Sequence, residues 1–185
     1  MLQPRVALVL VGLVAAAGLV QASPQARPAA GPAPAVLVMN TVHGVVEIEL
    51  LPDAPKSVAR VLELVTRNFY RGLRIHVAQP NMIQFGDPAT RNMESMGAWG
   101  QGGSRQTLGF SELGKRPFTR GMVGYAYPRG EGPERADSQL FILKSNTPAM
   151  TGKYVVVGRV TTGMDVVDKL GHADMIRNIT LKPAS

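Results

Sequence analysis

Apolar and polar residues alternate along one segment near the start of the folded region. Val45–Leu50 reads V-V-E-I-E-L, with aliphatic residues at every second position, and Ala35–Asn40 before it is apolar and rich in β-branched residues. A two-residue period is typical of a strand with one buried face. The pattern therefore predicts a β-hairpin that turns near His43 and Gly44.

A helical period replaces the alternation after the proline-rich break at Pro52–Pro55. Apolar residues recur every three or four positions between Val58 and Val65, with charged residues between them. This spacing predicts a helix over Lys56–Asn68, and a similar short pattern predicts a second helix over Met164–Leu170.

The remaining apolar runs are short and closely spaced. They predict six further strands, at Arg74–Val77, Met82–Phe85, Met122–Ala126, Gln139–Leu143, Tyr154–Val160 and Asn178–Leu181. Two helices cannot supply the crossovers that a parallel sheet of this size needs. The predicted fold class is mainly β: a closed antiparallel β-barrel of about eight strands, capped by two helices. The Gly-rich segment Asp87–Pro117 has no clear period, and a loop of that length is usually functional or disordered.

The N-terminus has the layout of a secretory signal. Arg5 is the only charged residue of the first 22, and an unbroken run of apolar and small residues follows it from Val6 to Val20. We predict a signal peptide at 1–22, a Pro/Ala-rich linker at 23–34 and one domain at 35–182. The protein is then exported, either periplasmic or secreted. An uncleaved membrane tether through residues 6–20 stays open as an alternative.

Composition excludes several kinds of site. The 185 residues include no cysteine, so a disulfide framework, a thiolate metal site and a cysteine nucleophile are excluded. The net charge is +7, but the basic residues are scattered singly, which argues against dedicated nucleic-acid binding. Gly97–Gly103 lacks the lysine and hydroxyl residue of a P-loop. No two histidines stand at metal-ligand spacing, and His76 is expected to be a buried structural residue.

Seven blocks of sequence, in order, carry a specific pattern. They are Gly72–His76, Pro80, Met82–Pro88, Gly100–Gly103, Asp137–Ile142, Gly152–Gly158 and Gly163–Val167. In this order and spacing, from about Val36 to Leu181, the chain resembles the cyclophilin-type peptidyl-prolyl cis-trans isomerases. The segments S-Q-x-F-I and G-K-x-V-V-x-G are the most specific parts of the resemblance.

The resemblance implies an isomerase that assists the folding of exported proteins and needs no cofactor or metal. Its partners would be proline-containing segments of unfolded or exported proteins, and it would act as a monomer. It also implies a groove on the outer face of the barrel. By position, Met82, Phe141 and Met150 match the proline pocket, Gln84 and Gln139 its polar edge, Ala126 and Tyr127 the peptide-binding strand, and Ala149 and Tyr154 the rim. Gln84 also matches a catalytic position.

The chain departs from the family's pattern at several of these positions. Val77 stands where the family carries its catalytic arginine, and an aromatic residue before Met82 is missing. Ala149 and Tyr154 replace the family's usual tryptophan and histidine. We therefore expect reduced activity, with Arg129 or Arg105 as candidate replacements for the arginine. The alternative is a proline-peptide-binding or chaperone-like module that is non-catalytic or weakly catalytic.

Overall fold

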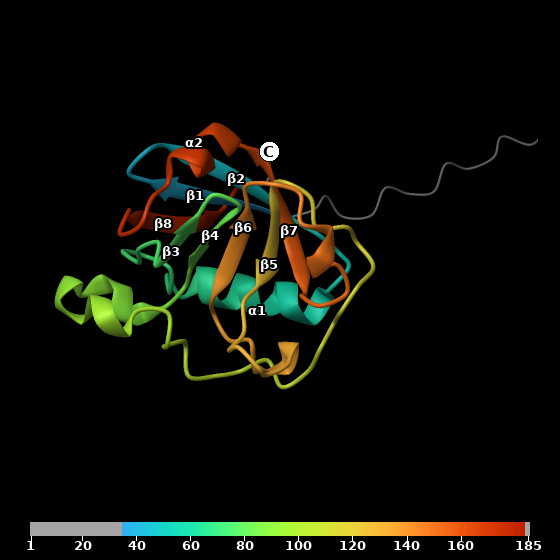
Figure 1. The fold of residues 1–185 in the computed structure, drawn as a ribbon. Helices are drawn as coiled ribbons and strands as arrows, with labels where there is room; N and C mark the ends of the chain where they lie inside the picture. Colours follow the sequence, from blue (N-terminus) through green and yellow to red (C-terminus); the bar gives the residue numbers. More distant parts are fainter. Residues whose placement is uncertain (1–34, 184–185) are drawn as a thin grey trace, which may run out of the picture. The chain divides into compact units, whose positions relative to one another are not determined.

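A computed structural model describes residues 35–183 (Figure 1). The expected signal peptide and linker lie outside the described residues, so both stay predictions. Within 35–183, no helix is both long enough and apolar enough to cross a membrane.

One antiparallel sheet of eight strands forms the framework of the domain, as the sequence predicted. The strands are β1 Val36–Thr41, β2 Val45–Leu50, β3 Val77–Gln79, β4 Met82–Phe85, β5 Met122–Tyr125, β6 Leu140–Leu143, β7 Val156–Thr162 and β8 Ile176–Leu181. Their order across the sheet is β3-β4-β6-β5-β7-β2-β1-β8, and every pair is antiparallel.

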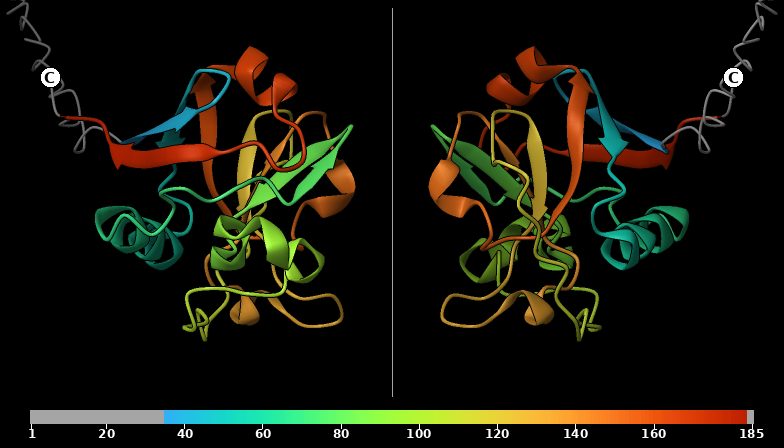
Figure 2. Two further views of the ribbon diagram at one scale, coloured as in Figure 1. Left: turned by 90° about the vertical axis from the view of Figure 1, so that its left-hand side faces the viewer. Right: turned by 90° about the vertical axis from the view of Figure 1, so that its right-hand side faces the viewer.

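The expectation of a closed barrel is corrected. The sheet curls strongly, as Figure 2 shows, but its edge strands β3 and β8 form no ladder with each other in the described part of the chain. Only an isolated bridge between Arg74 and Met175 and a few neighbouring backbone hydrogen bonds join the two edges. The molecule is therefore an open, curled half-barrel.

The strand predicted at Arg74–Val77 is wrong except at its last residue, Val77. The backbone N–H of Arg74 donates to Thr90 Oγ1 at 3.0 Å instead of entering a ladder. Leu73 and Ile75 are completely buried, so their apolar character reflects core packing. The regular strand begins only at Val77 and pairs with β4.

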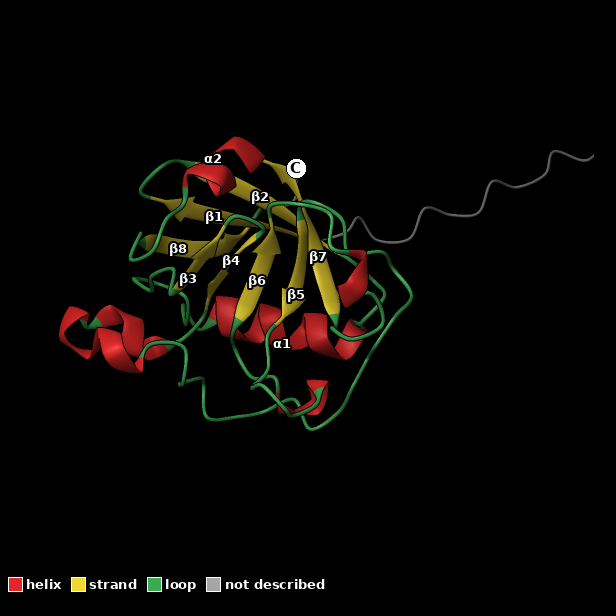
Figure 3. Cartoon of the chain, viewed as in Figure 1, coloured by secondary structure: helices red, strands yellow, loops and turns green. Residues whose placement is uncertain are grey.

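Two α-helices cover opposite ends of the curled sheet (Figures 1 and 3). α1 spans Pro55–Thr66 and α2 spans Met164–Lys169, close to the predicted ranges. The carboxylate of Glu112 accepts hydrogen bonds from the backbone N–H groups of Lys56 and Ser57 at the start of α1. A negative charge there satisfies otherwise unpaired helix donors.

The core divides into two clusters on the two faces of the sheet. The main cluster fills the concave side, where Ile83, Phe85 and Ile142 are fully buried. The second cluster lies on the outer face and consists of Leu51, Phe118, Phe141, Leu143 and Val156. Neighbouring strand residues alternate between these clusters, because side chains along a strand point to opposite faces.

Short 3₁₀ helices interrupt the connections. They are η1 Pro88–Arg91, η2 Met93–Ala98, η3 Pro133–Arg135 and η4 Pro148–Met150. η1 and η2 lie in the Gly-rich segment Asp87–Pro117, which otherwise runs as an irregular loop around the sheet (Figure 3).

Candidate functional site

Strands β4 and β6 present polar and apolar side chains together on the outer face of the sheet. In β4, Ile83 and Phe85 are buried in the main core, whereas Met82 and Gln84 are half-buried on the other face. Phe141 lies directly opposite Gln84 in the neighbouring strand. Residues opposite each other in an antiparallel pair share one face, so the register brings Gln84 beside Phe141.

Gln139 is the centre of the polar half of this face. Its amide oxygen accepts hydrogen bonds from Gln84 Nε2 at 2.7 Å and from His76 Nε2 at 3.1 Å. Its amide nitrogen donates to the carbonyl oxygens of Gly100 at 2.8 Å and Gly102 at 2.7 Å. Both lone pairs of the amide oxygen and both hydrogens of the amide nitrogen are used in these bonds. The orientation of the Gln139 amide is therefore fixed.

His76 is buried, as expected, but it is also tied to this network. Burial lowers the pKa of His76 below its usual value, although Asp87 and the hydrogen bond with Gln139 act in the opposite direction. Because the amide oxygen of Gln139 can only accept, His76 Nε2 is the donor of their hydrogen bond. Its Nδ1 has no hydrogen-bond partner among residues 35–183.

A glycine-rich wall faces the two glutamines. The buried carboxylate of Asp87 accepts hydrogen bonds from the backbone N–H groups of Gly100 at 2.6 Å and Gly102 at 3.1 Å. Gly100 has a φ of 87°, which favours glycine. A Cβ atom at position 102 would lie 2.4 Å from Asp87 Oδ1. The wall can approach Asp87 this closely only because glycine occupies position 102.

A pocket of about 520 Å³ opens between this wall, the glutamines and the segment after β5. It is lined by Gln84, Gly100, Gln101, Gly102, Gly103, Thr107, Ala126, Tyr127, Pro128, Arg129, Arg135, Asp137 and Gln139. Arg135 pairs with Glu131 at 2.5 Å, whereas the structure records no ion pair for Arg129 in the described range. The pocket thus combines amide groups, backbone groups and an exposed guanidinium.

The apolar half of the face adjoins the pocket. Met82, Ala126, Met150 and Tyr154 all pack against the outer cluster that contains Phe141. Phe141 is only 1% exposed, and the rings of Phe118 and Tyr154 both pack against it, with centroids 5.8 Å and 5.5 Å away. Tyr154 in turn stacks on Tyr127 at 4.8 Å. The apolar residues predicted for a proline pocket are brought together, but Phe141 is buried among them and the open volume lies beside them.

A comparison with protein families explains this arrangement. The family model described as "Cyclophilin type peptidyl-prolyl cis-trans isomerase/CLD" matches residues 36–184. The chain belongs to the cyclophilin-type peptidyl-prolyl cis-trans isomerases. The enzyme class expected from the sequence is thereby confirmed at the level of the family.

Relatives of this cyclophilin domain include bacterial and fungal proteins. A "Probable peptidyl-prolyl cis-trans isomerase" of Brucella suis biovar 1 is 38% identical over 151 residues, covering 79% of this chain and 76% of the relative. A "Peptidyl-prolyl cis-trans isomerase-like 1" of Rhizopus delemar is 31% identical over 137 residues, covering 73% and 79%.

Solved cyclophilin structures share the fold. A Cryptosporidium parvum cyclophilin-type isomerase, crystallised in the presence of the dipeptide Ala-Pro, gives a TM-score of 0.67 at 22% identity and covers 80% of this chain and 99% of that one. A cyclophilin from Hirschia baltica gives 0.64 at 19% identity, covering 78% and 73%.

Val77 stands at the position where the sequence resemblance led us to expect an arginine. It pairs directly with Gln84, so its side chain shares the outer face with the glutamine. Arg74 does not replace an arginine at position 77, because its Nη1 donates to the carbonyl of Ala173 at 2.9 Å, in the connection between α2 and β8. Met82 and Gln84 keep their outward orientation, so the shortened turn before β4 does not shift the strand register.

The two candidate replacements for the arginine, Arg129 and Arg105, differ in their position relative to the pocket. Arg129 lines the pocket, whereas Arg105 is exposed and absent from the pocket lining within 35–183. Ala149 is exposed on η4, next to Met150. Sequence reasoning missed His76, Arg135 and Asp137 as neighbours of the groove. His76 and Asp137 lie within the matched blocks Gly72–His76 and Asp137–Ile142, and this position in the blocks is the signal that could have found them.

Proposed function

We propose that this cyclophilin domain catalyses cis-trans isomerisation of X-Pro bonds at the face formed by Gln84, Gln139 and the outer apolar cluster. The observation that carries the proposal is the fixed Gln84–Gln139 pair beside the buried Phe141 ring. An apolar surface that accepts a prolyl ring, next to oriented amides for the peptide backbone, is what recognition of such a segment requires.

The chemistry needs no cofactor. The barrier is the amide resonance of the X-Pro bond, roughly 18 to 20 kcal/mol, and a groove lowers it by binding the twisted amide better than either planar form. Gln84 uses one amide hydrogen on Gln139, so its second N–H and its oxygen are available to the peptide. We assign Gln84 a catalytic role, and Ala126 and Tyr127 the binding of the peptide backbone.

We propose further that the rate is low for the family. Val77 has no hydrogen-bond donor beyond the backbone, and removing one donor aimed at the transition state typically costs about 10² to 10³ in rate. Arg129 lines the pocket and is the remaining cation best placed to compensate. Phe141 is buried, so the side chains packed against it, Tyr154 among them, must also move before a prolyl ring can reach it.

A binding module without catalysis is the second candidate, favoured by Val77 and by the burial of Phe141. Exchange NMR on an Ala-Pro peptide with the domain from residue 35 onward separates the two. Catalysis gives faster cis-trans exchange that is lost in Gln84→Ala. A pure binder shifts the peptide signals without accelerating exchange, and that result would reject the proposed enzyme.

The proposed substrates are unfolded segments of exported proteins. This rests on the signal-like pattern of residues 1–22, and uncatalysed prolyl isomerisation is slow enough to limit folding after export. N-terminal sequencing of the protein from the producing cell tests the localisation. A mature chain that begins at Ser23 supports export, whereas an intact chain found only in the cytoplasm would contradict it.

A further inference from the structure

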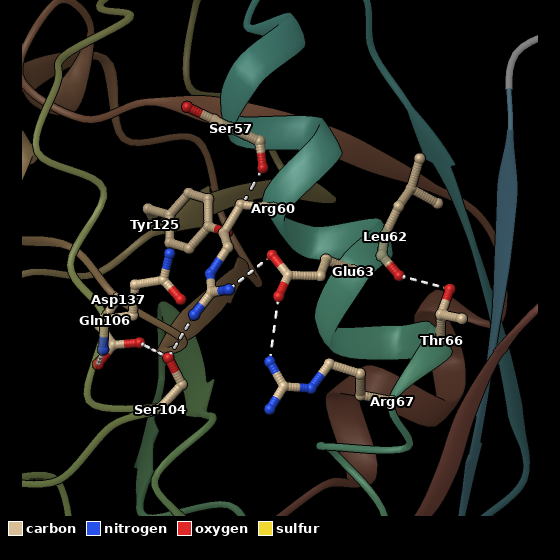
Figure 4. Close-up of polar contacts among 10 residues, drawn as sticks. All are labelled: Ser57, Arg60, Leu62, Glu63, Thr66, Arg67, Ser104, Gln106, Tyr125 and Asp137. Atoms are coloured by element: carbon tan, nitrogen blue, oxygen red, sulfur yellow. Dashed lines mark hydrogen bonds and ion pairs between the residues drawn. The ribbon is translucent and has the colours of Figure 1, made fainter.

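Helix α1 carries a buried arginine that points toward the loop beside the pocket (Figure 4). Arg60 is only 7% exposed and lies one residue before Val61, which is part of the main core. Burying a guanidinium is costly unless its donors are paired. Its contacts therefore indicate what its charge is used for.

Two of the three guanidinium nitrogens are paired. Nη1 donates to Glu63 Oε2 at 2.6 Å, and Nη2 donates to Ser104 Oγ at 2.6 Å. Nε has no hydrogen-bond partner among the described residues. Hydrogen bonds from Arg60 and Arg67 lower the pKa of Glu63, which fits a charged Arg60. Glu63 is 46% exposed, so its contact with Arg60 remains accessible to water.

The second contact leads from the helix to the pocket. Ser104 Oγ also bonds to Asp137 Oδ1, and a hydroxyl has a single hydrogen to donate. Since Arg60 can only donate, it occupies an acceptor position of the hydroxyl and directs the serine hydrogen toward Asp137. Arg60, Ser104 and Asp137 thus form a relay of one defined polarity (Figure 4).

Asp137 fixes the wall of the pocket that it also lines. Its Oδ2 accepts from the backbone N–H of Gln106 at 3.3 Å. A Cβ atom at Gly103 would lie 2.4 Å from the same oxygen, so the loop packs directly on the carboxylate. The carbonyl of the adjacent Gly102 accepts from Gln139, whose oxygen in turn accepts from Gln84.

We propose that Arg60 is a positioning residue of the groove, a role that rests on the function proposed above. It acts through Ser104 and Asp137 to hold the wall at residues 102–106, and the wall orients the amides of Gln139 and Gln84. Arg60 itself does not contact the peptide. Three segments far apart in the sequence, on α1, the Gly-rich loop and the start of the β6 region, are joined by this relay.

The variants Arg60→Met and Ser104→Ala test the relay. Each is expected to weaken binding of an Ala-Pro peptide about tenfold, because small displacements of positioned groups have large effects. Both should speed amide hydrogen exchange at Gly103 and Gln106 and broaden the Gln139 side-chain amide signal. The double variant should lose no more than either single variant, because both changes break the same relay.

Matched controls separate positioning from helix stability. Glu63→Gln removes the negative charge that Arg60 Nη1 faces but leaves the Ser104 contact, and Arg67→Met removes an exposed arginine that follows the C-terminal end of α1. Both should keep peptide binding within about twofold of the unaltered chain. Ser104→Ala keeps the test decisive if Arg60→Met does not fold.

Wild-type binding and unchanged hydrogen exchange in folded Ser104→Ala would overturn the proposal, as would additive losses in the double variant. The exchange and side-chain signals are measured without peptide. A chain that fails to isomerise prolyl bonds would therefore contradict the proposed function and still leave the relay tested.

Discussion

Restoring an arginine at position 77 is the most informative single change at the groove. Val77 pairs directly with Gln84, and neighbouring strands lie about 4.8 Å apart. Both side chains point to the outer face, and Val77 is half-buried at the edge of the sheet, so a longer side chain can extend along the surface. The guanidinium of Val77→Arg would then lie beside the Gln84 amide, where the twisted X-Pro bond is proposed to bind.

The expected gain follows from the worth of one oriented donor. Such groups contribute about 10² to 10³ in rate, which corresponds to roughly 2.7 to 4 kcal/mol. We expect Val77→Arg to raise the catalysed exchange rate of an Ala-Pro peptide by about a hundredfold. Exchange NMR under identical peptide and protein concentrations measures this directly.

Ala78→Arg is the matched control for charge. Ala78 is exposed and pairs with Ile83, so its side chain points away from the outer face that carries Gln84. It adds the same charge one residue away and should leave the rate within about twofold. If folded Val77→Arg is no faster than the unaltered chain, or if Ala78→Arg gains equally, the explanation based on a missing donor at position 77 is wrong.

Three further outcomes are expected. Tyr154→Ala removes one of the two aromatic rings packed against Phe141 and should tighten binding of a prolyl peptide several-fold in a titration; weaker binding would mean that the Tyr154 ring belongs to the binding surface. Gly102→Ala should lower the free energy of unfolding by about 1 to 3 kcal/mol, because its Cβ would lie 2.4 Å from Asp87 Oδ1, whereas Gly97→Ala meets no atom within 4 Å and should change little in urea unfolding. Burial lowers the pKa of His76, so below pH 6.5 the unfolded chain binds more protons than the folded chain. The free energy of unfolding should therefore fall as the pH drops from 6.5 toward the lowered pKa. If a His76→Gln variant shows the same pH slope, His76 is not the cause.

The periodic spacing of apolar residues was enough to predict most of the helices and strands. The alternation in Val45–Leu50 and the helical spacing after Pro55 identified β2 and α1. The strand predicted at Arg74–Val77 is right only at Val77, because the backbone N–H of Arg74 donates to Thr90 Oγ1 and only an isolated bridge forms at Arg74. The prediction of a closed barrel was wrong because pairing between two edge strands leaves no pattern in the sequence of either strand.

The candidate site was predictable where polar residues interrupt apolar strands. Gln84 and Gln139 stood out in this way, and they do hydrogen-bond each other. The relay through Arg60 and Ser104 left no comparable signal, since its contacts span 44 and 33 residues of sequence. An arginine on a helix is usually solvated, and only the folded chain places this one against the loop.

The central claim is that a prolyl peptide binds over the Gln84–Gln139 pair beside Phe141. Its most direct test is a titration of the ¹⁵N-labelled domain with an Ala-Pro peptide, following the side-chain amide signals of both glutamines. We predict saturable shifts of these two signals together with the backbone signals of Gly102 and Ala126. Shifts confined to the far side of the domain, around Asn40 and Arg177, with both glutamine amides unmoved at saturation, would contradict the claim.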